Sequence, residues 1–207
     1  DEALSANEAL CSGGRSRSQG VSDRKKASSA TPGSRVQMKQ RRHKLLDAFG
    51  GVGGVTAQCL KLGVVGTVHD FVANPSHDFR SRPFVRSVCR MIKRRYFRAG
   101  MFHTPCTSLC IARDRNSQIR NRNSPLGLPI SQLSPKQITT LKDGNETMHA
   151  SLRMIREFDR LGLPWILENP QTSRLWLCPV FVALMKQTNV QFVVFHMCQF
   201  GSKFKRP

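Results

Sequence analysis

Three short strings combine side chains suited to chemistry on a heteroaromatic ring. They are residues 47–54 (Asp-Ala-Phe-Gly-Gly-Val-Gly-Gly), residues 104–109 around Cys106, and residues 167–170 around Glu168. A glycine turn lets a nucleoside cofactor approach the backbone, a thiolate is a nucleophile, and a carboxyl group can donate a proton to a ring nitrogen or share one with it. Their order along the chain predicts one site assembled from three segments.

The glycine string has neither a lysine typical of phosphate-binding loops nor the dinucleotide fingerprint. It therefore suits an adenosyl or amino-acid group, and a plain strand-to-helix turn is the alternative. Asp70 ends the second predicted strand, where an acid can reach a ribose. A surface or capping role is the alternative for Asp70.

Cys106 follows a proline at the predicted carboxyl edge of the sheet, where open α/β folds bind ligands. Arg113 and Arg115 follow shortly and are expected to lower the pKa of the thiol. The alternative is a buried structural cysteine. Glu168 follows an apolar run, and burial there would favour its protonated form, which can donate to a ring nitrogen. A helix-capping Glu168 is the alternative.

The 207 residues include 33 Lys and Arg against 13 Asp and Glu, a formal charge of +20. This balance predicts a polyanionic partner, in the first place nucleic acid. Seven scattered cysteines and no secretory signal favour a reducing, intracellular compartment, the nucleus in a eukaryote. No stretch is apolar enough to span a membrane. Because the chain starts at Asp1 and ends after a basic run, we expect a piece of a longer protein.

The pattern along the chain predicts a basic disordered arm over residues 1–43 and one α/β domain over residues 44–207. Short apolar runs alternate with helical periods, which is typical of a doubly wound, mostly parallel sheet. Strands are expected at residues 44–49, 66–71, 101–103, 164–168 and 190–196. Helices are expected at 55–62, 83–97, 134–161 with a break near 143–144, and 179–187; residues 114–133 are expected to form a long loop.

A structural zinc site is a competing interpretation of the cysteines and histidines. Its ligands would come from His103, Cys106, Cys110, His196 and Cys198. Zinc sites usually have two ligand pairs, each spaced by two to four residues, and the spacing here is looser. We therefore expect no metal.

The strings resemble the motifs of the cytosine-C5 DNA methyltransferase family, which uses S-adenosylmethionine. Residues 47–54 resemble its first motif, an acidic residue, one spacer and then Phe-x-Gly-x-Gly-Gly. Residues 105–112 resemble its Pro-Cys nucleophile motif, and residues 168–170 its Glu-Asn-Val motif. Residues 200–206 resemble its late Tyr-Gly-x-Pro-Gln-x-Arg region. The resemblance covers about residues 45–207 and depends on the motifs occurring in the family's order.

The resemblance implies a Rossmann-like fold, S-adenosylmethionine as cofactor, and methyl transfer to cytosine C5 in DNA, with RNA as the second substrate. Cys106 would attack C6 of a flipped-out cytosine, Glu168 would contact the N3 edge, and Arg206 completes the implied catalytic set. Asp70 would reach the ribose and Asp78 the adenine amino group. The implied cofactor-binding residues are Asp47, Phe49, Gly50, Gly51, Gly53, Gly54, Asp70, Asp78 and Pro105.

The chain also departs from the family's pattern. Thr107 stands where the family has Gln, Pro170 replaces Val, and no target-recognition region is recognisable. The alternative function is therefore a nucleic-acid-binding domain that kept the fold and lost turnover. An amino-directed base methyltransferase would carry an Asp- or Asn-Pro-Pro-aromatic string. The string at residues 104–107 reads Thr-Pro-Cys-Thr instead and argues against it.

Overall fold

The computed structural model describes residues 44–115 and 117–196. The predicted basic arm at residues 1–43 lies outside the described residues, and so do Cys198 and Arg206.

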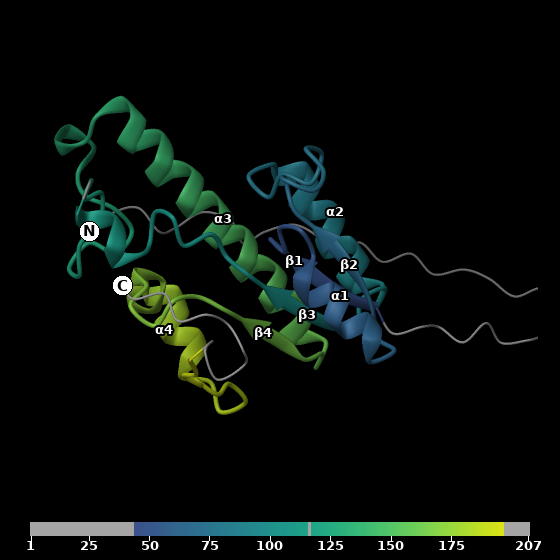
Figure 1. Cartoon of the computed structure of the whole chain (residues 1–207). Coiled ribbons are helices and arrows are strands. Elements are labelled where there is room, and N and C mark those ends of the chain that lie inside the picture. Colours follow the sequence, from purple (N-terminus) through teal and green to yellow (C-terminus); the bar gives the residue numbers. More distant parts are fainter. Residues whose placement is uncertain (1–43, 116, 197–207) are drawn as a thin grey trace, which may run out of the picture. The chain divides into compact units, whose positions relative to one another are not determined.

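A parallel sheet of four strands forms the centre of this part of the chain (Figure 1). Its spatial order is β2-β1-β3-β4, so β1 and β3 are the inner strands. The strands are short apolar runs, as expected where helices cover a parallel sheet. Their bounds are β1 Lys44–Ala48, β2 Val65–His69, β3 Ala99–Phe102 and β4 Trp165–Leu167. The described residues thus form an α/β fold compatible with a Rossmann-like arrangement.

Helices connect successive strands and bury apolar stripes. Ser81 caps α2 and Ser134 caps α3, in both cases with proline in the first turn, as the sequence predicts for α3. The helix α3 is the longest element and packs against α2, β3 and β4. The bounds are α1 Gly54–Lys61, α2 Arg82–Lys93, α3 Pro135–Arg160 and α4 Pro179–Met185, with 3₁₀ helices at Ile111–Arg115, Ile130–Gln132 and Arg174–Leu177.

The main core lies between the sheet and the pair α2 and α3. Leu46 and Phe102 from the sheet meet Val88, Ile155 and apolar neighbours, all buried. On the other face, α1 contacts β1 and β2 yet buries none of its own residues. The sheet is therefore anchored mainly through α2 and α3.

Three predicted elements were wrong in detail. The segment at 190–196 forms no strand: its apolar side chains from Phe192 to Phe195 are exposed, and a segment with strand propensity forms a strand only where it can pair with another strand. The helix expected to reach residue 97 ends at Lys93, and Arg95 then adopts a left-handed conformation with φ of 55°. The break expected near Gly144 is absent, because α3 is continuous there.

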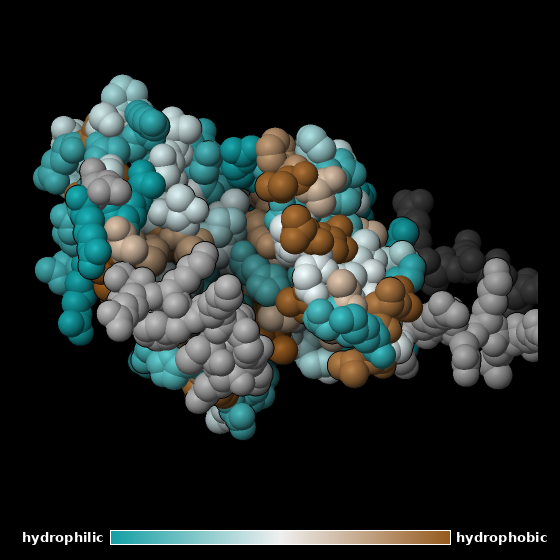
Figure 2. Space-filling view, in the orientation of Figure 1, coloured by the Kyte–Doolittle hydropathy of each residue, from teal (hydrophilic) through white to brown (hydrophobic). Residues whose placement is uncertain are grey.

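Apolar side chains gather on the surface around α1 and β2, shown in brown in Figure 2. Val52, Leu60, Leu62 and Val72 are all mostly exposed there. Across the described residues, no helix combines the length and apolar character needed to cross a membrane.

Candidate active site

The carboxyl ends of the four strands bring the predicted site residues to one edge of the sheet. Phe49 follows β1, Asp70 follows β2, and Glu168 follows β4. Cys106 lies four residues beyond the end of β3. This edge, between the inner strands β1 and β3, is where open α/β sheets bind ligands. The structure therefore gathers segments that are up to 120 residues apart in sequence.

A cavity of about 420 Å³ opens at this edge. Its size is in the range of small-molecule sites in proteins. Four of the predicted cofactor residues line it: Phe49, Asp70, Asp78 and Pro105. The other lining residues are Phe71, Val72, His77, Phe79, Arg80, Thr107, Ser108, Thr140, Asp143, Gly144 and Thr147. Aromatic rings, carboxylates and hydroxyls thus share one cavity, which suits a nucleoside.

The glycine string forms the turn between β1 and α1. The Gly51 N–H donates to Asp70 Oδ2 over 3.0 Å, and Gly51 has a left-handed φ of 55°. Phe49, which is not glycine, also has a left-handed φ of 60°. Such a conformation is unfavourable for a bulky side chain, so the surroundings must hold it in place. Asp70 therefore fixes the turn and faces the cavity at once.

Asp47 lies beneath this turn rather than in the cavity lining. Its carboxylate is fully buried and accepts from the Thr56 hydroxyl at 2.7 Å and the Thr56 N–H at 3.3 Å. A Cβ added at Gly50 would lie 2.6 Å from the Asp47 carboxyl carbon. Glycine is needed at position 50 because the carboxylate occupies the space of a side chain. Asp47 supports the turn and does not line the cavity.

A row of three titratable groups crosses the edge of the sheet. His103 Nε2 lies 3.4 Å from Asp47 Oδ1, an ion-pair contact rather than a hydrogen bond, and His103 Nδ1 lies 3.7 Å from Glu168 Oε2. Asp47 first, and then Glu168, raise the pKa of His103 to about 9 against the effect of burial. Burial alone would raise the pKa of Asp47, but His103 and Thr56 outweigh it and lower it. His103 is therefore an imidazolium at neutral pH.

The sequence pattern missed this role of His103, which it suggested only as a zinc ligand. The available signal was its position directly after β3 and three residues before Cys106. Which carboxylates it meets depends on the strand order, which places β1 and β4 on either side of β3.

Cys106 is half-buried and its two sequence neighbours, Pro105 and Thr107, line the cavity. Burial raises the pKa of the thiol, and Cys110 and Glu168 raise it further. The expected lowering by Arg113 and Arg115 is wrong for this state, because the net effect of the described surroundings is the opposite one. The thiol keeps its proton at neutral pH.

Glu168 is not buried as the sequence predicted: 45 % of its side chain is exposed. It directly follows β4 at the sheet edge, and its carboxylate lies 3.7 Å from His103. Its neighbour Asn169 donates from Nδ2 to the Thr104 carbonyl over 2.6 Å. Thr104 in turn donates its hydroxyl to Ser151 on α3 at 2.7 Å. The segments carrying Cys106 and Glu168 are thereby tied to each other and to α3.

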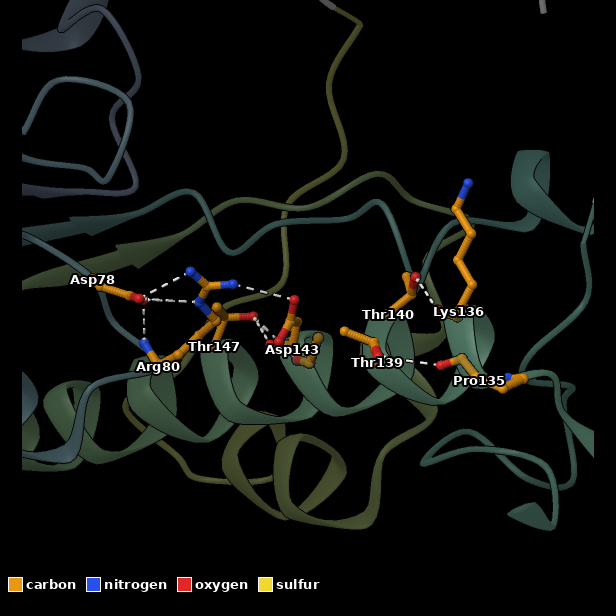
Figure 3. A network of polar contacts seen from close by, with 9 residues as sticks. Asp78, Arg80, Pro135, Lys136, Thr139, Thr140, Asp143 and Thr147 are labelled. Carbon is orange, nitrogen blue, oxygen red and sulfur yellow. Dashed lines mark hydrogen bonds and ion pairs between the residues drawn. The ribbon is translucent and has the colours of Figure 1, made fainter. Parts of the chain in front are cut away.

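The Arg80 guanidinium lies between two carboxylates, those of Asp78 and Asp143 (Figure 3), and all three residues line the cavity. The Arg80 side chain binds both carboxylate oxygens of Asp78, at 2.9 to 3.2 Å, and reaches Asp143 on α3 at 3.2 Å. Asp78 lines the cavity, but its oxygens are already engaged by Arg80. An adenine amino group would have to share Asp78 with this guanidinium.

Next to the lining residue Ser108 lies a fully buried guanidinium, that of Arg120. It donates to the carbonyls of Ser108 and Pro125 at 2.9 and 2.7 Å, to the Ser108 hydroxyl at 3.2 Å, and to the Leu141 carbonyl at 3.4 Å. Burial lowers the pKa of Arg120 to about 10. A Cβ at Gly144 would lie 1.9 Å from the Ser108 hydroxyl, which explains a glycine inside α3. The long loop thus docks on α3 at Gly144.

Two histidine rings pack beside the cavity. His77, a lining residue, lies 4.6 Å from His69 between ring centroids. Burial first, and then His77, lower the pKa of His69 to about 4. His69 is therefore neutral at physiological pH.

Within residues 44–115 and 117–196, no group of three or more His, Cys, Asp or Glu is arranged to hold a metal ion. Cys198, one of the ligands considered for zinc, lies outside this range.

Searches against protein-family models, curated protein sequences and solved structures find no match to this chain. The site must therefore be interpreted from its own geometry.

Proposed function

We propose that this chain is an S-adenosylmethionine-dependent methyltransferase that acts on cytosine C5 in nucleic acid, DNA before RNA, through Cys106. One observation carries the proposal: a single cavity is lined both by Phe49, Asp70 and Asp78 and by the two neighbours of Cys106. A cofactor there would lie next to the thiol. The motifs in the sequence suggest the chemical class, and a cavity lined by the neighbours of Cys106 supports the proposal, because such a transfer requires proximity.

The cavity residues fit the nucleoside part of the cofactor. Phe49 and Phe79 pack with ring centroids 4.2 Å apart and, with Phe71, offer apolar surface to a purine. Asp70 retains acceptor capacity for a ribose hydroxyl, because each of its oxygens receives one backbone N–H bond, from Gly51 and Val72. When bound, the cofactor supplies a methyl group on a positively charged sulfur.

In this proposal Cys106 Sγ bonds to cytosine C6, and the ring's electron pair becomes available at C5. C5 then bonds to the methyl carbon while the bond from that carbon to the cofactor sulfur breaks, and its electron pair stays on the sulfur. C5 next loses its own proton to a base, and the electron pair left at C5 expels Cys106 Sγ from C6 as a thiolate. Glu168 meets the N3 edge of the ring. His103 acts on Glu168 as a positioning residue, because its imidazolium holds the exposed carboxylate near the sheet edge.

The raised pKa of Cys106 sets a condition on this mechanism. The thiol must lose its proton once the substrates are bound, since the thiolate is the nucleophile. The same observation, together with the exposed Glu168, favours a second candidate: a nucleic-acid-binding domain with this fold and no turnover.

Covalent trapping separates the two candidates. The protein is incubated with S-adenosylmethionine and DNA or RNA containing 5-fluorocytosine, which cannot release the C5 substituent. We expect a denaturation-resistant adduct that requires the cofactor and is lost in Cys106→Ser. Cys110→Ser is the matched control, since Cys110 is half-buried on the same turn. Cofactor binding without an adduct supports the second candidate, and no cofactor binding contradicts the proposed function.

A further inference from the structure

We propose that the solvent-facing side of α2 and α3 binds the phosphate backbone of double-stranded nucleic acid. This surface is separate from the cavity. The inference rests on the proposed function in one respect, namely that a nucleic acid is the partner.

The first half of this surface is a stripe along α2. Arg82, Arg86, Arg90 and Lys93 recur every three or four residues and therefore share one side of the helix, and all are exposed. The opposite side buries Val85, Val88, Cys89 and Ile92. The helix contains no acidic residue. At 1.5 Å per residue, the stripe is about 16 Å long.

The second half lies on the C-terminal part of α3. Arg153, Arg156 and Arg160 are exposed and again spaced by three or four residues. Between them, Met154, Ile155 and Phe158 are buried against the core. Each helix thus presents cations outward while its apolar residues hold it in place.

The two stripes adjoin on one surface. Lys93 Nζ on α2 lies 3.1 Å from Glu157 Oε1 on α3, and the Arg160 guanidinium binds the other oxygen of Glu157 at 2.9 Å. Packed helices lie about 8–10 Å apart, so the rows run side by side at a spacing below the width of a DNA groove. We call this set the cationic face: Arg82, Arg86, Arg90, Lys93, Arg94, Arg153, Arg156 and Arg160.

Six of the eight cations make no ion pair with a carboxylate among the described residues; only Lys93 and Arg160 do, both with Glu157. Like charges held this close repel each other, and a polyanion relieves that repulsion. A duplex carries one phosphate charge per about 1.7 Å of its axis, so a 16 Å stripe faces about nine of them.

The composition of the face favours phosphate over an anionic membrane. Seven of its eight cations are arginines, whose planar guanidinium matches phosphate oxygens in pairs. No large apolar side chain is exposed on α2 or α3, whereas membrane-surface helices insert such residues. The face also begins near the cavity, because Arg82 lies two residues after the lining residue Arg80. A duplex held there extends away from the site.

The test compares two quadruple variants with the same loss of charge. One carries Arg86→Gln, Arg90→Gln, Arg153→Gln and Arg156→Gln. The control carries Lys61→Gln, Arg122→Gln, Lys136→Gln and Lys186→Gln, four exposed cations that do not belong to the cationic face. Binding to a 30-base-pair duplex is measured across a salt series. Because all eight positions are exposed, we expect both variants to fold, and unfolding midpoints check this.

We expect the face variant to bind at least about tenfold more weakly, with a log Kd against log salt slope smaller by up to about 3.6, since each of the four phosphate contacts contributes about 0.9. The control should keep the wild-type slope. Equal losses in both variants overturn the proposal, as does wild-type binding to phosphatidylserine vesicles without binding to the duplex. A short single-stranded 5-fluorocytosine oligonucleotide tests the cavity separately. If it forms no adduct while duplex binding still depends on the face, the proposed function fails and this inference stands.

Discussion

Replacing His103 by glutamine tests the row of charges that joins β1, β3 and β4. Glutamine keeps a polar side chain of similar length and removes the positive charge. The fully buried Asp47 then loses the cation that holds its pKa down, and Glu168 loses its partner. The variant therefore isolates the electrostatic contribution of the imidazolium to the free energy of unfolding.

The magnitude follows from the pKa of His103. Its rise from 6.5 to about 9 corresponds to about 3 kcal/mol, at about 1.4 kcal/mol for each tenfold change in proton affinity. Because the folded state binds the proton more tightly than the unfolded state, this stability is fully present below pH 6.5. It declines as the pH rises, and is lost above about 9. Most of this stabilisation comes from the interaction of His103 with Asp47, because exposed ion pairs such as that with Glu168 contribute less than about 1 kcal/mol.

Urea unfolding near pH 6 measures the stability with His103 protonated, and unfolding near pH 9.5 measures it with His103 mostly neutral. We expect His103→Gln to lower the free energy of unfolding by up to about 3 kcal/mol near pH 6 and by less than about 1 kcal/mol near pH 9.5. The difference between variant and wild type cancels the contributions of the other groups, which both proteins share. Exposed His149→Gln is the control and should change little. An equal loss at both pH values would refute the reasoning, because it would mean that His103 acts by packing alone.

Three further predictions concern stability. Gly50→Ala should cost about 2–3 kcal/mol, because its Cβ would lie 2.6 Å from the Asp47 carboxyl carbon; a neutral result in urea unfolding would contradict the tight turn. Stability should fall as pH drops from 6.5 to about 4, because His69 resists protonation in the fold. His69→Phe should reduce this decrease in the free energy of unfolding between pH 6.5 and about 4. An unchanged decrease would mean that other groups cause it. Arg120→Met should cost about 3 kcal/mol by leaving buried carbonyls unpaired, with Arg120→Lys recovering only part; wild-type stability of the methionine variant would contradict this.

Local signals predicted most of the fold. The apolar run before the glycines predicts β1, and the Ser134-Pro135 pair predicts the start of α3. Such signals work because strand ends and helix caps are decided by neighbours in sequence. The segment at 190–196 failed because a strand needs a partner edge, which sequence alone does not supply.

Some features of the candidate site could likewise be predicted from the sequence, and others could not. Asp70 was named from its position at a strand end, and Phe49 and Pro105 from the resemblance of their strings to family motifs; all three line the cavity. The exposure of Glu168 and the role of His103 were not, since both depend on how β3 and β4 pair. The glycine at position 144 suggested a break, but it is the contact point of Ser108 on a continuous helix.

The bonds of Arg120 have a consequence for the order in which this domain opens. One side chain joins carbonyls from Ser108, Pro125 and Leu141, and the Leu128 N–H also binds the Ile119 carbonyl at 2.9 Å. The loop and the helix are therefore held together by the hydrogen bonds of one side chain, and neither can open without breaking these bonds. In hydrogen exchange, amides of residues 119–128 and of the middle of α3 should open as a single unit rather than fray residue by residue. A ligand that occupies the cavity would slow the exchange of amides in this loop that it does not touch.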